Sequence, residues 1–510
     1  MDENLKAPRA VIVGSGFAGL CLAHHLRQAG IPFTILEKAD RLGGTWRDNI
    51  YPGAACDVPS MSYCFSFAQK TDWSRKWSPQ EEILDYLEDC ADRLGIRPHI
   101  RFDTEVAGAR FDETRGAWKI RTTDGEEIEA EIFVSAVGQL HRPSIPQIPG
   151  RDDFRGPAFH SARWRRDVEL AGKRVAVVGN AASAIQFVPE IAKTAGKVLV
   201  FQRSANWMIP RNDRAFTDAE RRRFARRPWL ARLVRWLTWA SYETMWPTFA
   251  GNRFTARLQR RIAETYLAET IPDPAMRRVL TPEYPIGAKR ILISDDYYAA
   301  LTRDNVELIT AGIERMTTDG LVTSDGVKHE ADVVIFATGF RTTEFLVPME
   351  IEGRDGRSLN DAWREGAEAY LGMTVAGFSN FFMMYGPNTN LGHNSIIFMI
   401  ECQAGYIIDC LRKMREAGAT QIDVTPETMR AYNDELQATL RNRVWARVDH
   451  SWYKNEAGRI TNNWSGSTIE YWRRTRKADL SKYRLIRADV SAQDGSETAT
   501  ATGAAERSAA

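Results

Sequence analysis

The stretch Ala10-Val11-Ile12-Val13-Gly14-Ser15-Gly16-Phe17-Ala18-Gly19 decides the fold, because a short apolar run passes directly into a glycine-rich turn. The following residues predict a helix up to Ala29, ended by Gly30, and a second strand at 33–36 that ends at Glu37. Such a turn lets a phosphate approach the backbone at a helix N-terminus, and the acid accepts ribose hydroxyls. The alternative is a glycine-rich turn without a ligand. Strand, helix, second strand and acid in register favour a dinucleotide site.

A second glycine-bearing segment, Gly43-Gly44-Thr45-Trp46, leads through Tyr51-Pro52-Gly53 to Cys56-Asp57. Its glycine density predicts a loop that lies against a flat ligand. After this loop, Ser78-Pro79-Gln80-Glu81 predicts a helix start with a capping box and a proline at the first helical position. We expect that helix to end at Gly95.

One passage occurs twice in the chain, which indicates an internal repeat. In the first copy, Asp124-Gly125 joins two hairpin strands, and the second strand is predicted to continue through 132–134 to Ala136-Val137-Gly138. In the second copy, Asp325-Gly326 and Ala337-Thr338-Gly339 stand in the same places. The spacing from the Asp to the last Gly is 14 residues in both copies. Each nucleotide motif therefore has its own hairpin and strand end, which predicts two homologous nucleotide domains.

The second motif, Gly179-Asn180-Ala181-Ala182-Ser183-Ala184, keeps only the first of the three glycines. Pro189 should kink its helix or mark an early end. The next strand, 198–201, is followed by Gln202-Arg203-Ser204, with no acid in the place of Glu37. An arginine there can bind a 2′-phosphate through two hydrogen bonds, which an acid would repel. The second site is thus predicted to prefer NADP(H), unless Arg203 merely faces solvent.

Between the two motifs, Phe154-Arg155-Gly156-Pro157-Ala158-Phe159-His160-Ser161-Ala162-Arg163-Trp164 follows a segment with three prolines at 143–149. Prolines with few apolar runs predict an exposed crossing rather than a strand inside a sheet. One interpretation is that Phe154 and Trp164 dock this crossing on the domains, and that His160 makes an ordinary hydrogen bond. The other, favoured by its place between two nucleotide domains, is that His160 and Trp164 couple domain motion without acting as acid–base catalysts.

Composition limits the functional classes. With 510 residues the chain should form two or three domains, and 68 basic against 66 acidic residues give no overall attraction to nucleic acid. The six cysteines form no CxxC motif, so neither a metal site nor a redox disulfide is predicted, and scattered thiols suggest a cytoplasmic protein. Neither a signal peptide nor a transmembrane segment is expected, because Pro387 and its polar neighbours interrupt the uncharged stretch 370–400. The tail 488–510 is predicted to be disordered.

The segment 212–284 is predicted to be a helical insertion. It contains a run of arginines between Arg221 and Arg227, followed by Trp229, Leu233, Trp236, Leu237, Trp239 and Trp246. The arginine run predicts a solvated helix face. The aromatic residues are interpreted as the lining of a substrate passage, with a weak peripheral membrane contact as the alternative.

These observations predict an α/β fold with two Rossmann-like dinucleotide-binding domains, one for FAD and one for NADPH. Hydride transfer between the two cofactors follows, and without a CxxC the electrons should pass to a diffusible acceptor or to oxygen. The predicted division is 1–150 for the first part of the FAD domain, 151–211 and 285–340 for the two parts of the NADP domain, 212–284 for the insertion, 341–487 for the second part of the FAD domain, and 488–510 for the tail.

These motifs resemble those of type I Baeyer–Villiger monooxygenases, from about residue 10 to 476. The crossing matches the family signature F-x-G-x-x-x-H-x-x-x-W, although Arg165 follows where Pro or Asp is usual. The Lys289-Arg290 pair and the Gly386-Pro387-Asn388 turn agree as well, and the segment from Trp452 to Trp464 looks most like the 4-hydroxyacetophenone monooxygenase branch. The matching residues are Phe154, Gly156, His160 and Trp164 of this signature, and Gly44, Trp46, Tyr51, Pro52, Gly53 and Asp57 of a second, longer one.

The resemblance implies that NADPH reduces FAD, that oxygen adds at flavin C4a, and that the resulting peroxyflavin inserts one oxygen atom next to a ketone carbonyl to give an ester or lactone. It implies that Arg290 is the catalytic arginine, that Asp57 is its acidic partner, and that Lys289 adds charge near the NADP 2′-phosphate. A flavin-containing monooxygenase that oxidises N or S atoms is the first alternative. A flavoprotein that only consumes NADPH is the second.

The predicted cofactor-binding residues are Gly14, Gly16, Phe17, Ala18, Gly19, Glu37, Lys38, Gly44, Thr45, Trp46, Asp57, Tyr63, Gly179, Ala182, Ser183, Arg203, Ser204, Lys289, Gly339 and Asn388.

Overall fold

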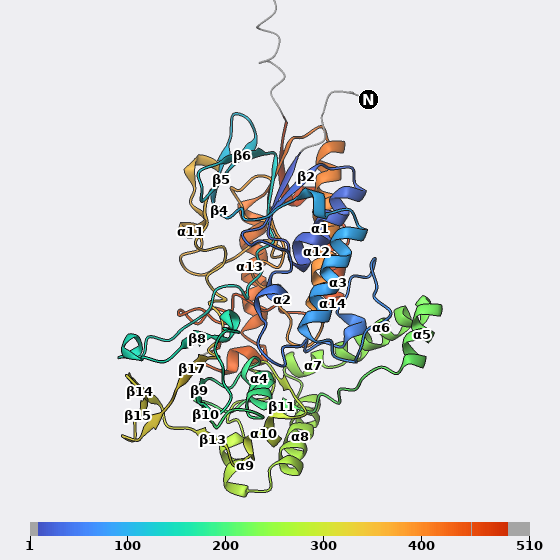
Figure 1. Cartoon of the computed structure of the whole chain (residues 1–510). Helices are drawn as coiled ribbons and strands as arrows, with labels where there is room; N and C mark the ends of the chain where they lie inside the picture. The colour runs from blue at the N-terminus through green and yellow to red at the C-terminus, as the bar shows by residue number, and fades with distance from the viewer. Residues whose placement is uncertain (1–8, 450, 488–510) are drawn as a thin grey trace, which may run out of the picture.

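Two parallel five-stranded sheets form the framework of this computed structural model, which describes residues 9–449 and 451–487 (Figure 1). This arrangement confirms the predicted α/β class with two Rossmann-like units. The first sheet has the order β19 (Phe381–Met383), β7 (Ile132–Ser135), β1 (Ala10–Val13), β2 (Phe33–Leu36) and β3 (Ile100–Arg101). The second has the order β13 (Val306–Ile309), β10 (Lys197–Phe201), β9 (Arg174–Val178), β17 (Val333–Phe336) and β8 (Ala158–His160).

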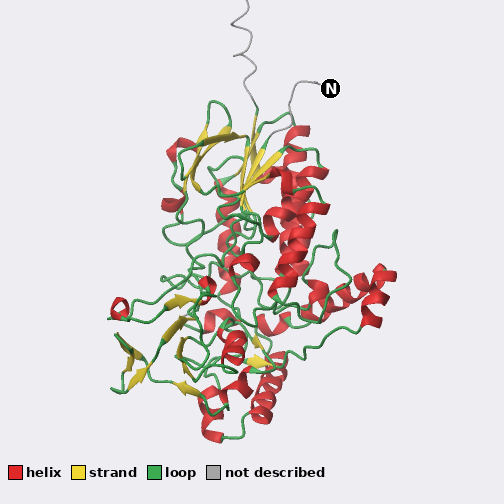
Figure 2. Cartoon of the chain, in the orientation of Figure 1, coloured by secondary structure: helices red, strands yellow, loops and turns green. Residues whose placement is uncertain are grey.

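The central strand β1 shows why the opening stretch folds as it does. All four of its residues are buried, as expected for a parallel strand that is covered on both faces. The register aligns Val13 with Leu36 of β2 and with Ser135 of β7, so the three strands end at one edge. Helix α1 (Phe17–Gln28) starts at this edge and packs against α12 (Ile396–Glu416). In Figure 2 these helices stand beside the strands of the first sheet.

The repeat inferred from the sequence is visible in the small antiparallel sheets, which confirms both hairpins. Their strands are β18 (Glu350–Glu352), β4 (Val106–Asp112), β5 (Ala117–Thr122) and β6 (Glu127–Ala130) in the first unit, and β14 (Ile313–Thr317), β15 (Gly320–Thr323) and β16 (Lys328–Glu330) in the second. The expectation that the second hairpin strand continues to the Ala-x-Gly end is wrong. The strand is interrupted between Ala130 and Ile132 because β6 belongs to the hairpin sheet and β7 to the parallel sheet.

Strand β8 corrects the prediction that the segment 154–164 is an exposed crossing. Residues Ala158–His160 pair in parallel with β17, and Phe336 lies opposite His160. Phe159 and His160 are buried. A strand of three residues has too few positions for periodicity to reveal it, and its partner is far away in the sequence. In the second sheet, the edge position next to β17 is therefore filled by β8, which precedes the other strands of that sheet in the sequence. In the first sheet, the corresponding position next to β7 is filled by β19, which follows the other strands.

The two passages of the chain between the units are hydrogen-bonded to each other. The Ser144 N–H donates to the Gly339 carbonyl at 2.8 Å, and the Arg341 N–H donates to the Arg142 carbonyl at 3.0 Å. Pro143 and Phe340 form an antiparallel bridge between these two bonds. The outgoing and the returning passage therefore form one two-stranded connection.

Helix α3 (Gln80–Arg93) begins one residue later than predicted. Pro79 is its N-cap instead of its first residue, and the predicted capping box is absent because the Ser78 hydroxyl donates to Ser60. The helix ends before Gly95, which has a φ of +63°, as predicted. Helix α4 (Ala184–Ile191) contains Pro189 and ends two residues after it, which confirms the early end.

The insertion is helical, as predicted, and comprises α5 (Asp218–Arg226), α6 (Pro228–Glu243), α7 (Trp246–Phe249), α8 (Arg253–Thr270) and α9 (Pro274–Leu280). The C-terminal end of α6 is anchored by Glu243, which accepts hydrogen bonds from the Thr468 N–H at 3.0 Å and from the Thr468 hydroxyl at 2.6 Å. Burial would raise the pKa of Glu243, but hydrogen bonds from His393 and Thr468 lower it to about 2. This carboxylate therefore remains charged and holds the insertion on the main body.

Within residues 9–449 and 451–487, no helix combines the length and the apolar character that crossing a bilayer requires. The tail predicted to be disordered, 488–510, lies outside the described residues.

We expect Gly19→Ala to destabilise the first unit by about 1–3 kcal/mol, because the new Cβ would lie 2.0 Å from the Gly14 carbonyl oxygen. Gly405→Ala in α12 is the matched control, since no atom lies within 4 Å of its Cβ position and alanine favours a helix over glycine. Thermal unfolding of both variants checks this expectation. Equal melting temperatures for Gly19→Ala and Gly405→Ala would contradict the close packing of α1 against the glycine turn.

Candidate active site

The carboxyl ends of both parallel sheets face one cavity of about 1140 Å³. Val13, Leu36 and Ala136 line it from the first sheet, and Val178 and Phe201 line it from the second. In open α/β sheets, ligands bind at the carboxyl ends of the strands. One cavity thus serves both nucleotide motifs, which brings two bound ligands within reach of each other.

Most residues predicted for the site lie on the wall of this cavity. Those are Gly14, Gly16, Phe17, Ala18, Glu37, Lys38, Gly44, Thr45, Trp46, Asp57, Tyr63, Gly179, Ala182, Ser183, Arg203, Ser204, Lys289, Arg290 and Gly339. The structure places Gly19, Asn388, Phe154, Gly156, His160 and Trp164 outside the wall.

The first glycine of each motif is explained by the strand end that was predicted to accompany it. Gly14 has a φ of +104°, and a Cβ there would lie 2.8 Å from the carbonyl oxygen of Ala136. Gly179 has a φ of +107°, and its Cβ would lie 2.5 Å from the carbonyl oxygen of Ala337. Each Ala-x-Gly strand end therefore packs directly on its own glycine turn, which is why the two elements recur together.

The first motif has a cradle suited to a phosphate. Gly16 and Gly44 come from different loops and face each other, so that a Cβ on Gly16 would lie 3.9 Å from the Gly44 Cα. Helix α1 begins at Phe17, directly after Gly16, and a helix N-terminus carries unpaired N–H donors that favour an anion. Side chains at either glycine would fill the space that a phosphate needs.

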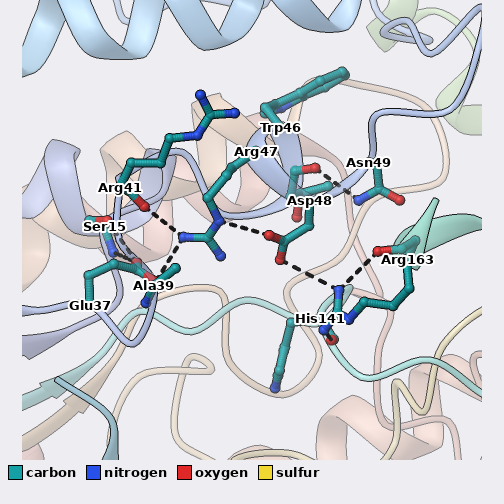
Figure 3. Close-up of polar contacts among 12 residues, drawn as sticks. Ser15, Glu37, Ala39, Arg41, Trp46, Arg47, Asp48, Asn49, His141 and Arg163 are labelled. Atoms are coloured by element: carbon teal, nitrogen blue, oxygen red, sulfur yellow. Dashed lines mark hydrogen bonds and ion pairs between the residues drawn. The ribbon is translucent and has the colours of Figure 1, made fainter. Parts of the chain in front are cut away.

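Glu37 lies in a dense polar network next to this cradle (Figure 3). Its carboxylate accepts hydrogen bonds from the Ser15 hydroxyl at 2.7 Å, the Ser15 N–H at 3.0 Å and the Ala39 N–H at 3.1 Å. Arg47 donates at 2.8 Å to Oε1, the oxygen that also accepts from Ala39, whereas Ser15 donates to Oε2. These four donors orient the carboxylate at the edge of the first nucleotide motif.

The same network reaches the signature segment. Arg47 donates to Asp48 at 2.7 Å, and Asp48 lies 3.9 Å from the guanidinium of Arg163 (Figure 3). Arg163 also donates to the His141 carbonyl at 3.4 Å. A chain of charged groups thus connects Glu37 at the nucleotide turn with the residue before Trp164. Arg47, Asp48 and Arg163 were missed by sequence reasoning, because nothing in a single chain marks which arginine meets which acid.

The second motif has two cations without an acidic partner. Within the described chain, no carboxylate lies within 4.0 Å of Arg203 or Lys289, and both residues line the cavity. Lys289 lies over the ring of Tyr284 at 4.6 Å. Burial, and then the nearby Arg203, lowers the pKa of Lys289. Two unpaired positive charges on one wall are suited to a multiply charged anion such as a phosphate.

Asp57 and Arg290 come together although 233 residues separate them. The Arg290 Nε donates to Asp57 Oδ2 at 2.8 Å, and Nη2 makes a second contact with the same oxygen. Each side chain remains about one third exposed, and both line the cavity. The Asp57 carboxylate raises the pKa of Arg290, so the guanidinium is charged at every working pH. The pair therefore presents to the cavity a guanidinium that is always protonated and is held in place by a carboxylate.

Tyrosines surround this pair, and sequence reasoning missed them. Tyr385 lines the cavity and its hydroxyl donates to Asn390 at 2.7 Å. Tyr453 is fully buried, which raises its pKa to about 12. Both phenols are therefore neutral at pH 7. One available signal was the position of Tyr385 directly before the Gly386-Pro387-Asn388 turn.

Asn388 supports the wall from behind. Its amide donates to the Ile460 carbonyl at 2.8 Å and to the Asn463 carbonyl at 3.0 Å, which fastens the turn to the Trp-rich segment. Trp452, from that segment, does line the cavity. Within the described chain, none of the tryptophans of the insertion lies on the cavity wall, and their role as the lining of a substrate passage stays a prediction.

The signature residues pack around the second sheet instead of facing the cavity. A Cβ on Gly156 would lie 2.3 Å from the Asp332 carbonyl oxygen and 2.8 Å from the Phe154 ring, so only glycine fits there. Trp164 packs on Phe187 of α4, with 5.3 Å between ring centroids. Tyr51, from the loop of the first unit, also contacts Phe187, with 5.9 Å between ring centroids. Trp164 therefore supports the contact between the two units.

His160 is buried at the end of β8. Its Nδ1 accepts the Ala162 N–H at 3.1 Å, which places the ring proton on Nε2. Burial lowers the pKa of His160 to about 4, so the imidazole is neutral near pH 7 and is not an imidazolium that could act as a general acid. This charge state supports a positioning role over acid–base catalysis.

Comparison with known proteins places the chain in a family. A protein described as a Baeyer–Villiger monooxygenase from Streptomyces coelicolor is 44% identical over 500 residues, which cover 97% of this chain and 96% of that protein. The chain belongs to the Baeyer–Villiger monooxygenase family. The family model for flavin-binding monooxygenase-like proteins also matches residues 7–224. The name shared by the full-length relatives favours this family over the monooxygenases that oxidise N or S atoms.

Solved structures agree with this assignment. An oxidised steroid monooxygenase bound to NADP superimposes with a TM-score of 0.83 and 33% identity, covering 94% of this chain and 100% of that one. The OTEMO complex with FAD and NADP gives a TM-score of 0.85 at 28% identity, with the same coverage of both chains. The OTEMO structure holds both FAD and NADP, and both neighbours match the fold of this Baeyer–Villiger monooxygenase over their whole length.

We expect His160→Ala to slow NADPH-dependent turnover about fivefold, the effect of losing one hydrogen bond that fixes a loop, while the bound flavin content stays unchanged. His160→Asn should recover most of the rate, because its side-chain oxygen can accept the Ala162 N–H. Steady-state turnover and the flavin-to-protein absorbance ratio test this. An unchanged rate in His160→Ala would mean that His160 only packs in the fold and does not couple domain motion to turnover.

Proposed function

We propose that this Baeyer–Villiger monooxygenase uses NADPH and O₂ to insert one oxygen atom next to the carbonyl of an apolar ketone, giving an ester or lactone and water. The observation that carries the proposal is the Asp57–Arg290 pair, whose permanently protonated guanidinium lies where the two nucleotide sites open into one cavity. Oxygen insertion develops negative charge at the reacting oxygens, and a fixed cation stabilises it.

The residues of the first motif fit FAD. Gly14, Gly16 and Gly44 would hold its phosphates, and Glu37 would accept its ribose hydroxyls. When bound, FAD supplies the redox chemistry that accepts a hydride and activates oxygen. The protein supplies orientation, charge and the exclusion of water.

Arg290 is proposed as the catalytic residue. Its guanidinium cannot lose its proton, so it can stabilise an oxyanion without taking part in proton transfer. Asp57 keeps the guanidinium in place through contacts of Nε and Nη2 with a single oxygen. A preorganised donor of this kind contributes about 3 kcal/mol to lowering the barrier.

The second motif is proposed to bind NADPH. Gly179, Ala182 and Ser183 would face its phosphates, while Arg203 and Lys289 would bind the 2′-phosphate. This assignment is supported by the absence of an acid partner for either cation in the described chain and by their shared position on the cavity wall. Ser204, the next residue along the wall, adds a hydroxyl donor.

The proposed substrate is an apolar ketone, because the cavity is lined by aliphatic side chains near Tyr385. Leu391, Ile396 and Ile400 line it on the side of α12, and Leu346 and Met349 line it from the segment after β17. We also propose a cytoplasmic location, since all six cysteines are free thiols.

We expect Arg290→Ala to abolish ester formation, with a loss of at least about 100-fold, while NADPH still bleaches the flavin absorbance. Arg290→Lys is the matched control, since it keeps the charge but loses the double contact with Asp57. Its rate of ester formation should lie between those of the wild type and Arg290→Ala. Mass analysis of products from a panel of ketones and sulfides measures the outcome. Retained oxygenation by Arg290→Ala would overturn the role of this residue, and oxides of sulfides as the only products would favour N or S oxidation.

We expect Arg203→Glu to weaken the binding of NADPH at least about tenfold more than the binding of NADH, because only NADPH carries the 2′-phosphate that the new carboxylate repels. Arg315→Glu makes the same charge reversal on β14, outside the cavity wall, and should affect both nucleotides equally. KM values for the two nucleotides test this. Equal losses in Arg203→Glu would mean that Arg203 does not contact the 2′-phosphate.

A further inference from the structure

Helix α6 presents an apolar stripe to solvent. Trp229, Leu233, Trp236 and Leu237 are 59%, 41%, 57% and 51% exposed. Their spacing places them on one face of the helix, since residues three, four, seven and eight apart share a side. Contiguous exposed apolar residues on a protein surface mark an interaction site, whereas scattered ones do not.

The opposite face of α6 is hydrogen-bonded to the rest of the protein, so the apolar stripe stays exposed to solvent. Arg235 donates to the carbonyls of Ser62 and Cys64, and Trp239 donates to Thr468 at 3.1 Å. Figure 1 shows α5 and α6 extending away from the body of the molecule. The stripe is therefore held rigidly on a projecting arm.

Unpaired arginines accompany the stripe. Arg222, Arg223, Arg226 and Arg227 on and after α5 are exposed, and none has a carboxylate within 4.0 Å in the described part of the chain. The acids of α5 are already occupied, because Glu220 pairs with Arg214 and Asp218 pairs with Arg221. The whole insertion, 212–284, contains 14 arginines, no lysine and 8 acids, although the chain as a whole is nearly neutral.

We propose that this α5–α6 surface docks the enzyme on an anionic phospholipid bilayer. An exposed apolar stripe rich in tryptophan, next to a cluster of basic residues, is the composition of a helix that lies in the membrane interface. The tryptophans enter the boundary between headgroups and acyl chains, and the guanidinium groups bind lipid phosphates through paired hydrogen bonds. Binding of this kind needs no transmembrane helix.

A second copy of the chain fits this surface less well. Pairing two identical stripes would bring two sets of unpaired arginines together, and like charges in an interface are unfavourable. The four exposed side chains also offer on the order of 400 Å², whereas a stable interface covers about 800 Å² on each partner. An anionic bilayer provides the opposite charge and has no such area requirement.

The test is co-sedimentation of the purified full chain with vesicles, without substrate or NADPH. The vesicles contain phosphatidylcholine alone, or phosphatidylcholine with about one third phosphatidylglycerol. The wild type should sediment with the anionic vesicles only, and increasing salt should weaken its binding. Equal binding to both kinds of vesicle, or to neither, would overturn the proposal.

Two variants separate the two parts of the surface. Trp229→Ser/Trp236→Ser should reduce vesicle binding at least about tenfold, because each indole loses its apolar burial. Replacing Arg222, Arg223, Arg226 and Arg227 by Gln should cost about fivefold for each charge and remove the preference for anionic lipid. Val327→Ser/Arg315→Gln alters an exposed apolar residue and an exposed arginine of the β14–β16 sheet region and should bind as the wild type does.

Turnover of a water-soluble ketone should be the same in all of these variants, because none of the altered side chains lines the cavity. Vesicle binding by Trp229→Ser/Trp236→Ser at the wild-type level would overturn the proposal. A wild-type dimer that the same substitutions convert to a monomer would also overturn it, in favour of self-association. Failure of ketone oxidation would leave the vesicle result intact, so the two proposals are tested separately.

Discussion

The ion pair between Asp57 and Arg290 joins two segments that lie 233 residues apart in the chain and meet at the cavity. Asp57 belongs to the loop after the first nucleotide turn, and Arg290 follows the helical insertion. Loss of Asp57 would leave a partly buried guanidinium without its nearest counter-charge, which is an unfavourable state. The same interaction that would support catalysis therefore also holds these two segments together.

The interface around this pair relies on close backbone contact. A Cβ on Gly53 would lie 2.6 Å from the Gln186 carbonyl oxygen, so glycine allows the loop of the first unit to meet α4 of the second. Gln186 then binds this loop through its side chain, accepting from the Tyr51 hydroxyl at 2.9 Å and donating to the Ala55 carbonyl at 2.9 Å. Loop 51–57 thus carries Asp57 to the cavity while it is attached to the opposite unit, which limits how far the two sites can separate while that contact holds.

Local patterns in the sequence were sufficient for the elements around each glycine turn. β1, α1 and β2 were predicted closely, because a buried parallel strand and a glycine turn leave strong local signals. Strand β8 was missed, since three residues have no period and their partner β17 is distant in the chain. The absence of a capping box at Ser78 and the network of Arg47, Asp48 and Arg163 depend on which side chains meet in space, which one sequence does not state. Asp57 and Arg290 were found through family resemblance, whereas Tyr385 and Trp452 needed the fold.

The hydrogen-bonded passages at Ser144 and Gly339 have a consequence for how the chain assembles. Almost two hundred residues lie between them, yet their ends meet as closely as the ends of a tight hairpin. The entropy of closing a loop grows only with the logarithm of its length, so the first unit loses little by carrying such a long excursion. From the standpoint of its own sheet, the second unit is an insertion in a single loop. A nucleotide-binding module could therefore be inserted at this point during evolution without changing the strand order of the first sheet.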